Sequence, residues 1–446
     1  MYTIAKGDIE NMFKNSIAWR IIITFISLII LYSLLLILAW SIPAGNAQKH
    51  LLESRDLIAK EGNYYRFFPL IGVAQTENWS DGYWWNMAYH ADLHDNAIVS
   101  AFSANYYEVS YPTVYGVDNL SVILESRSQN IPIESLNIQE NSYGRYWQGM
   151  TVILFPLLFF FNIIQIRIFF YIIMSALFTV FLYMIYKRLG KLYAGITLIS
   201  LLLIHFYAIP VSAQYITCFS VMLIFSMVCL RNSLPKSEYL PLYFFIAGSV
   251  VNYLDFLTTP LITFSVPAVI LATRYRKECP EYSAKKNTVF LIKNSICWCI
   301  GYFLTWITKW ILTYAITGNP EYLTGIRSHI SQRASLNQGI VKHTVDYVIA
   351  AGHNTLALCE TPAILLITAI GIVLLYKVHQ KYTLKQIFVM SLDYFWVFIV
   401  PYVWMILFAE HSRTHYHFVY RVLFGSVMAV FFALVNLVEN NPNQID

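Results

Sequence analysis

Long apolar runs make up most of this chain, and the turns that join them alternate between strongly basic and nearly neutral. Basic residues beside a span stay in the cytoplasm, so this alternation predicts which turns lie inside and which outside. The lysines and arginines gather at residues 6–20, 187–191, 231–236, 274–286 and 377–385. The turns around Pro210, Thr258–Pro260 and Glu410–His417 carry at most one such residue and are predicted to lie outside.

About ten of the apolar runs are long enough to cross a bilayer, which places both termini in the cytoplasm. The run Thr151–Ile163 is too short to span, and counting it would put Lys187–Lys191 outside. We therefore expect it to form a re-entrant or interfacial helix on the outer face. The predicted spans are 17–43, 168–186, 193–209, 213–230, 239–255, 260–273, 291–316, 362–376, 386–409 and 418–437.

The fold class that follows is an all-α polytopic membrane protein with extracytoplasmic juxtamembrane helices. We expect one membrane-embedded domain over residues 1–446, with a large first extracytoplasmic loop at 44–167 and a second at 317–361. Composition agrees, since 57% of the chain is hydrophobic and only 12% is charged. The formal net charge of +5 is too small to indicate a nucleic-acid partner. The first loop lacks cysteine, so we expect packing on the membrane domain or a ligand to order it.

The first loop holds a carboxylate pair within a dense aromatic group. Glu77 and Asp81 stand four residues apart and would share one face of a helix. A carboxylate partly desolvated by aromatic rings has a raised pKa and can accept a proton from a hydroxyl. Aromatic faces such as Trp84 and Trp85 also suit the C–H face of a sugar. The alternative is an interfacial aromatic belt in which Ser80 or Asp81 caps a helix.

Two further clusters are predicted on the outer face. Arg145, with Tyr146 and Trp147, precedes the short apolar helix and is a candidate phosphate ligand; a lipid-headgroup anchor is the alternative. Asn252 and Asp255 stand at an outer helix end, where an acid in apolar surroundings faces a cavity or caps a turn.

The last outer turn forms a basic cluster in a surface otherwise poor in charge. Such a cluster suits a phosphate or pyrophosphate leaving group. His411 and His415, four residues apart, could also ligate a metal, although no H-E-x-x-H arrangement is present. No cofactor is therefore assigned, and a divalent cation stays an open alternative. Lys309, Arg327 and Arg333 could reach the same cavity. The cluster comprises His411, Arg413, His415, His417, Tyr420 and Arg421.

Four short blocks, together with a large outer loop directly after the first span, give the chain a family resemblance. The sequence resembles the GT-C superfamily of multipass glycosyltransferases, and within it bacterial members associated with cell-surface polysaccharide. The blocks are E-N-W-S-D at Glu77–Asp81, Y-G-R-Y-W-Q-G at Tyr143–Gly149, N-Y-L-D-F-L-T-T-P at Asn252–Pro260 and H-S-x-x-H-x-x-F-x-Y-R at His411–Arg421.

The resemblance implies a multipass protein of the bacterial plasma (inner) membrane with an extracytoplasmic active site. It also implies a polyprenyl-phosphate-linked sugar as donor, a cell-surface glycan or lipid-linked acceptor, and inversion at the transferred carbon. We then expect Asp81, or else Glu77, to deprotonate the acceptor, and Asp255 to orient sugar or acceptor. Arg145, Arg421 and the histidines would converge on the donor phosphate.

Three other functions fit the same features to different degrees. A lipid-linked oligosaccharide flippase or other transporter predicts ionisable residues at the midplane of two corresponding halves. Here these residues gather at one face, apart from Lys309. A non-catalytic scaffold gives the polar clusters no role, whereas a polysaccharide polymerase or ligase would share them all.

Overall fold

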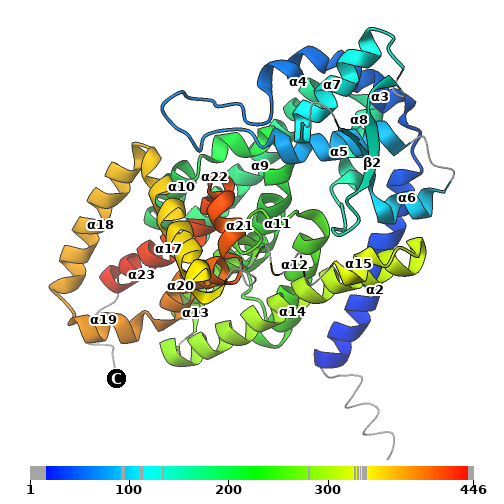
Figure 1. Ribbon diagram of the computed structural model, residues 1–446. Coiled ribbons are helices and arrows are strands. Elements are labelled where there is room, and N and C mark those ends of the chain that lie inside the picture. Colours follow the sequence, from blue (N-terminus) through cyan, green and yellow to red (C-terminus); the bar gives the residue numbers. More distant parts are fainter. Residues whose placement is uncertain are drawn as a thin grey trace, which may run out of the picture.

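The computed structural model describes residues 17–91, 96–110, 114–132, 135–279, 282–325, 328, 331, 333 and 339–439. Lys6 and Lys14, on which the cytoplasmic placement of the N-terminus depends, lie outside the described residues, as do Arg327 and the chain after Glu439. Helices dominate the described chain, which confirms an all-α architecture (Figure 1).

The chain from α3 to α8 forms a mostly helical unit at one end of the molecule, beside the C-terminal end of α2 (Figure 1). A single two-stranded antiparallel sheet, with Tyr107 opposite Glu140, lies within this unit. Arg167 ties the unit to the first helix of the main body, because its guanidinium donates two hydrogen bonds to Glu61, at 2.7 and 2.8 Å. The elements are α2 (Ile17–Trp40), α3 (Ala44–Glu53), α4 (Arg55–Glu61), α5 (Asn78–His90), α6 (Ala97–Ser103), β1 (Asn105–Val109), α7 (Gly116–Ser128), β2 (Ile138–Ser142) and α8 (Thr151–Phe160).

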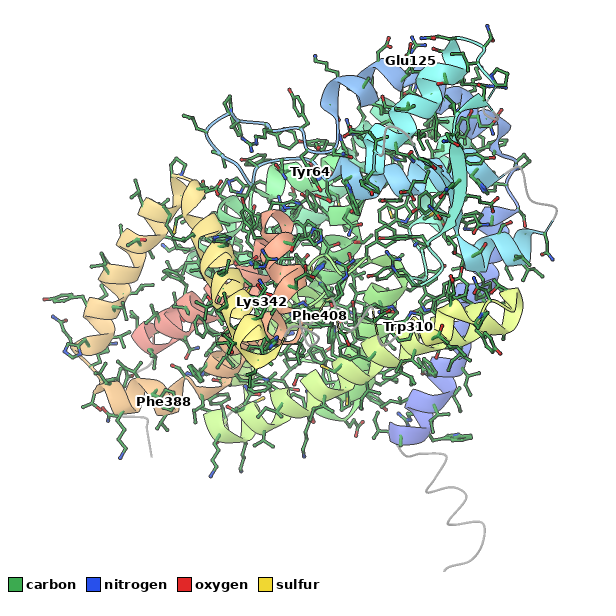
Figure 2. All side chains as sticks on the ribbon, in the orientation of Figure 1. Tyr64, Glu125, Trp310, Lys342, Phe388 and Phe408 are labelled. Atoms are coloured by element: carbon green, nitrogen blue, oxygen red, sulfur yellow. The ribbon has the colours of Figure 1, made fainter. Side chains whose placement is uncertain are left out.

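The main body is a bundle of apolar helices. Its first part comprises α9 (Ile163–Arg188), α10 (Lys191–Leu203), η3 (Phe206–Val211), α11 (Ala213–Cys229), η4 (Ser237–Tyr239), α12 (Leu240–Leu254), α13 (Ile262–Glu278), α14 (Ala284–Thr317) and α15 (Glu321–Thr324). Its second part comprises α17 (Gly339–Ala357), η6 (Leu358–Glu360), α18 (Ala363–His379), α19 (Leu384–Met390), α20 (Leu392–Leu407), α21 (Ala409–Thr414), α22 (Tyr416–Val419), η7 (Tyr420–Leu423) and α23 (Phe424–Glu439). Glu125 of α7 and Phe388 of α19 lie at opposite ends of the molecule (Figure 2).

Several helices have the length and composition to cross a membrane, which supports a polytopic membrane protein. Within the described chain four qualify: Ile17–Trp40, Ile163–Arg188, Ala284–Thr317 and Tyr416–Glu439. Two bent pairs raise the number to six: Gly339–Glu360 with Ala363–His379, at 99°, and Leu384–Met390 with Leu392–Leu407, at 76°. The predicted ten crossings are therefore not established. The ten residues of α8 rise only about 15 Å, half the hydrocarbon thickness.

Glycines bring α12 and α14 into backbone contact, and this contact fixes the position of the site. A Cβ atom on Gly248 would lie 2.1 Å from the carbonyl oxygen of Trp298, and one on Gly301 would lie 2.1 Å from that of Phe245. Only glycine permits so close an approach. The contact sets the rotation of α14 and so aims its indole side chains toward the turn before α8.

Candidate functional site

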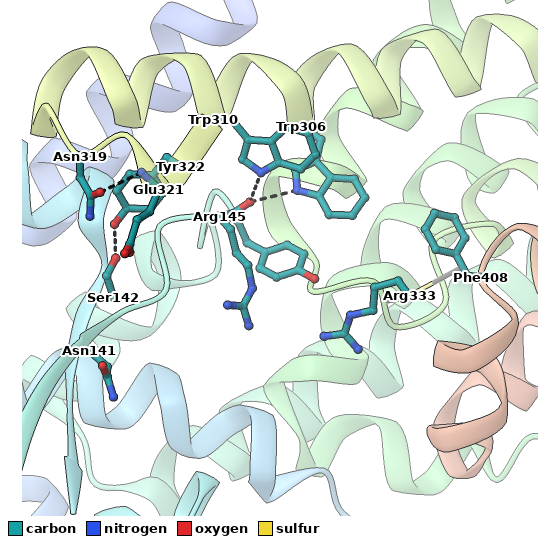
Figure 3. Close-up of a pocket in the computed structure, with 11 residues that line it drawn as sticks. Asn141, Ser142, Arg145, Trp306, Trp310, Asn319, Glu321, Tyr322, Arg333 and Phe408 are labelled. Carbon is teal, nitrogen blue, oxygen red and sulfur yellow. Dashed lines mark hydrogen bonds between the residues drawn. The ribbon is translucent and has the colours of Figure 1, made fainter. Parts of the chain in front are cut away.

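Two arginines from distant parts of the chain face one cavity of about 240 Å³. Arg145 comes from the turn before α8, and Arg333 from the segment between α15 and α17. Figure 3 shows both guanidinium groups directed into the same space, with the rings of Trp306 and Trp310 above the Arg145 backbone. The described lining residues are Asn141, Ser142, Arg145, Tyr146, Trp306, Trp310, Asn319, Glu321, Tyr322, Arg333 and Phe408.

The backbone of Arg145 is held independently of its side chain. Its carbonyl oxygen accepts hydrogen bonds from the indole N–H groups of Trp306, at 3.0 Å, and Trp310, at 2.9 Å. The guanidinium lies over the ring of Tyr143, 4.2 Å from its centroid, and within 5.7 Å of that of Tyr146. No described carboxylate forms an ion pair with Arg145, so its positive charge faces the cavity.

Arg333 is oriented by His411. The Nη1 group of Arg333 donates to His411 Nδ1 at 3.1 Å, while His411 Nε2 lies 2.8 Å from the carbonyl oxygen of Leu257. A carbonyl only accepts hydrogen bonds, so Nε2 carries the proton and Nδ1 is the acceptor. Burial lowers the pKa of His411, which favours this neutral form. His411, predicted as a phosphate ligand, therefore orients the side chain of Arg333 instead.

Asp255 supports this arrangement from a turn that follows α12. Its carboxylate accepts hydrogen bonds from the backbone N–H of Thr258, at 2.7 Å, and from the Thr217 hydroxyl, at 3.0 Å. The turn holds Leu257 at φ +74°, a strained conformation for a branched side chain, and so presents its carbonyl to His411. The sequence predicts that Asp255 orients sugar or acceptor, whereas in the structure its carboxylate holds this turn and is not among the described residues that line the cavity.

The two carboxylates predicted as the catalytic base lie away from the cavity. Asp81 is buried, and its oxygens accept the backbone N–H groups of Ala213 and Gln214, both at 2.9 Å, so it caps α11. Burial raises the pKa of Asp81 to about 7. Glu77 is also buried, accepts from Ser80 Oγ at 3.2 Å and lies 3.2 Å from His417 Nε2. A base must reach the substrate proton, and neither group opens onto the arginines.

Most of the aromatic residues predicted to contact substrate belong to the protein core. Trp84 is buried and donates to Gln148 Oε1 at 2.9 Å, and Trp147 donates to the carbonyl of Thr305 at 2.8 Å. Trp85 is buried as well. Tyr146, by contrast, lines the cavity.

Arg421 does not converge with Arg145, contrary to the expectation from the sequence. Its guanidinium is buried and donates to the carbonyl oxygens of Ile204, at 3.2 Å, and His417, at 3.2 Å. It also lies 4.1 Å from the ring centroid of Tyr215. The hydrogen-bond donors of Arg421 are occupied by backbone carbonyls, so its guanidinium does not face the cavity. The second arginine that faces the cavity with Arg145 is Arg333.

Other members of the basic cluster at 411–421 also have internal partners. Arg413 pairs with Asp346 of α17 at 3.0 Å, and Tyr420 donates to the carbonyl of Ile204 at 3.1 Å. His415 stacks on Phe418, and burial lowers its pKa to about 3. These residues therefore have partners within the protein and are not among the described residues that line the cavity.

Asn252 is buried beside the Asp255 turn. In the described part of the chain its Oδ1 atom has no hydrogen-bond partner. The structure places it outside the cavity lining.

The histidine cluster does not fit a metal centre. Among the residues that the structure describes, no three His, Cys, Asp or Glu side chains converge on a common point. His411 already uses both ring nitrogens for Arg333 and Leu257.

Sequence reasoning did not find Glu321, Trp306 or Trp310. Glu321 is exposed and is the only carboxylate among the described residues that line the cavity. Its backbone N–H donates to Asn319 Oδ1 at 2.9 Å, which shapes the turn after α14. The two tryptophans stand four residues apart on α14, a spacing that puts both rings on one face and is visible in the sequence. Their pairing with the backbone carbonyl of Arg145, more than 160 residues earlier, is not visible there.

Comparison of the chain with protein families, with curated proteins and with solved structures found no match.

Proposed function

We propose that this protein is a membrane glycosyltransferase that moves a sugar from a polyprenyl-phosphate donor to a cell-surface glycan or lipid-linked acceptor on the extracytoplasmic side. The observation that carries the proposal is the pair of guanidinium groups, Arg145 and Arg333, facing one aromatic-walled cavity (Figure 3). Guanidinium groups bind phosphate through two parallel charged hydrogen bonds, which makes a facing pair suited to a lipid phosphate.

The walls of the cavity match the other parts of such a donor. Tyr146, Trp306 and Trp310 offer flat apolar surfaces for a sugar ring or for the first isoprene units. Asn141, Ser142 and Asn319 supply polar groups that can bond sugar hydroxyls. An apolar wall with a few polar groups is the usual composition of a small-molecule site.

Glu321 is the carboxylate that we assign as proton acceptor in this reaction. The acceptor hydroxyl oxygen attacks the anomeric carbon, the bond from that carbon to the phosphate oxygen breaks, and the hydroxyl proton moves to Glu321. Polyprenyl phosphate leaves with the bonding electron pair. Arg145 and Arg333 stabilise its developing negative charge, and a single displacement inverts the anomeric carbon.

Purified protein in nanodiscs, supplied with a panel of polyprenyl-phosphate sugars and a membrane acceptor fraction, tests the proposal by mass spectrometry of the products. We expect release of polyprenyl phosphate together with a glycosylated acceptor. Arg333→Ala should abolish both signals, while Arg413→Ala, a matched loss of an outer charge that pairs with Asp346, should keep them. Donor binding without transfer across the whole panel would contradict the assignment as a transferase.

A further inference from the structure

A second cavity, about 340 Å³ in volume, lies far from the arginine cavity, among α18, α19, α20 and α23. It is a groove whose walls are apolar except at Ser391 and Tyr394. Tyr394 turns its hydroxyl away to Thr273 Oγ1, at 2.8 Å. The 76° bend between α19 and α20 separates α19 from the bundle and forms one wall of the groove. Figure 2 places Phe388, another wall residue, at this edge of the molecule.

The groove has a polar group at the bend that no described residue satisfies. Ser391 precedes α20, a position where serine hydroxyls usually accept a backbone N–H, yet its side chain makes no capping bond. Its buried Oγ atom has no hydrogen-bond partner among the described residues. A buried polar atom without a partner costs free energy, so this hydroxyl is suited to a bound polar group.

Two lysines lie near the end of the groove that the start of α19 forms. Lys381 donates to the carbonyl oxygen of Val438 at 2.7 Å, one residue beyond the wall residue Leu437, and Lys385 is exposed next to the wall residue Leu384. Among the residues that the structure describes, two acids near this end have basic partners of their own. Asp393 is buried and pairs with Arg276 at 3.1 Å, and Glu439 pairs with Lys277 at 2.9 Å.

The groove therefore presents a cationic end, then a hydroxyl, then an apolar trough. A phospholipid presents the same order, with an anionic phosphate, ester carbonyls and acyl chains. We propose that this groove binds an anionic phospholipid from the leaflet that the basic turns face, with its phosphate at Lys381 and Lys385, an ester carbonyl on Ser391 and an acyl chain along α23. The site is independent of the arginine cavity and of any transferase activity.

Photo-crosslinking of full-length protein in nanodiscs tests this site. Nanodiscs of phosphatidylcholine would carry a small fraction of phosphatidylglycerol bearing a diazirine in one acyl chain, and labelled peptides would be mapped by mass spectrometry. We expect labelling of 384–398 and 429–437 to exceed that of the lipid-facing helix α9. Each lysine near the phosphate should favour the anionic lipid over the zwitterionic one by about fivefold.

Three variants separate the parts of the site. Ala433→Trp fills the trough and should remove most labelling, while Ile172→Trp on the lipid-facing side of α9 is the matched control and should not. Lys385→Gln should lower the preference for phosphatidylglycerol about fivefold without lowering labelling by a diazirine phosphatidylcholine. Equal labelling of α9 and the groove, or equal competition by the two unlabelled lipids, would overturn the proposal.

Discussion

Arg145→Ala should weaken donor binding while leaving the fold of the cavity intact. The two indole hydrogen bonds end on the carbonyl oxygen of residue 145, which alanine keeps, so Trp306 and Trp310 stay in place. No described carboxylate pairs with the guanidinium, so its removal leaves no orphaned buried charge. The loss of the contact with the Tyr143 ring, at 4.2 Å, should lower the free energy of unfolding by only about 0.5–1 kcal/mol.

The effect on the donor should be larger than the effect on stability. A hydrogen bond between a charged donor and a phosphate contributes about 1.5–3 kcal/mol. That range corresponds to a dissociation constant raised roughly 10- to 150-fold. Arg145→Lys should fall between wild type and alanine, because an ammonium keeps the charge but not the two-pronged geometry.

Microscale thermophoresis with a short-chain polyprenyl phosphate measures these dissociation constants, for variants that are folded to the same extent as the wild-type protein. Arg413→Ala is the control for loss of an arginine that pairs with Asp346 and does not line the cavity, and it should bind like wild type. Wild-type affinity in a folded Arg145→Ala protein would refute the assignment of this guanidinium to the phosphate.

Three further predictions follow from the site and the topology. Glu321→Gln should lower turnover about 10²- to 10⁴-fold without changing donor affinity. Product formation at saturating donor measures this, and unchanged turnover would exclude Glu321 as the base. Burial raises the pKa of Asp81 to about 7, so the folded state holds this proton more tightly than the unfolded one; its stabilising contribution, at most about 4 kcal/mol, is complete below about pH 4 and lost as the pH rises through about 7. The unfolding temperature of the wild-type protein should therefore decrease as the pH is raised from 5 to 8, and Asp81→Asn should make this decrease smaller. An equal decrease in both proteins would contradict the raised pKa of Asp81. A cysteine at the exposed position Glu125 should react with an impermeant reagent in intact cells, and one at the exposed position Lys285 only after permeabilisation; equal labelling of both in intact cells would refute the charge-based topology.

Hydropathy predicted the helical segments well because burial in lipid and helix formation depend on local composition. It did not predict the break between α19 and α20. The hydropathy pattern favours one continuous span over 386–409 instead. Asp393 begins α20 with a buried carboxylate that Arg276 and Asn287 hold, at 3.1 and 2.8 Å. Those partners stand more than a hundred residues earlier, so no window around residue 391 contains the cause of the bend.

The sequence identified some of the residues that face the cavity and not others, because the positions of the side chains depend on long-range packing. Arg145 was identified from its aromatic neighbours in the sequence, and Arg333 was named as a residue that could reach the same cavity. The role of Asp81 depended on where the N-terminus of α11 lies, because two backbone N–H groups from that helix occupy its oxygens. The partners of Arg421 are backbone carbonyls, which carry no residue-specific signal. The residue types indicated which side chains could bind phosphate or accept a proton. Long-range packing determines which of these side chains face the cavity.

A cryo-electron microscopy structure of the protein in nanodiscs with a bound polyprenyl phosphate tests the central claim most directly. We predict phosphate density between Arg145 and Arg333, with nitrogen–oxygen distances of about 2.7–2.9 Å. The isoprenoid chain should leave along Trp306 and Trp310. Phosphate density at another surface, with both guanidinium groups facing an unliganded cavity, would contradict the account.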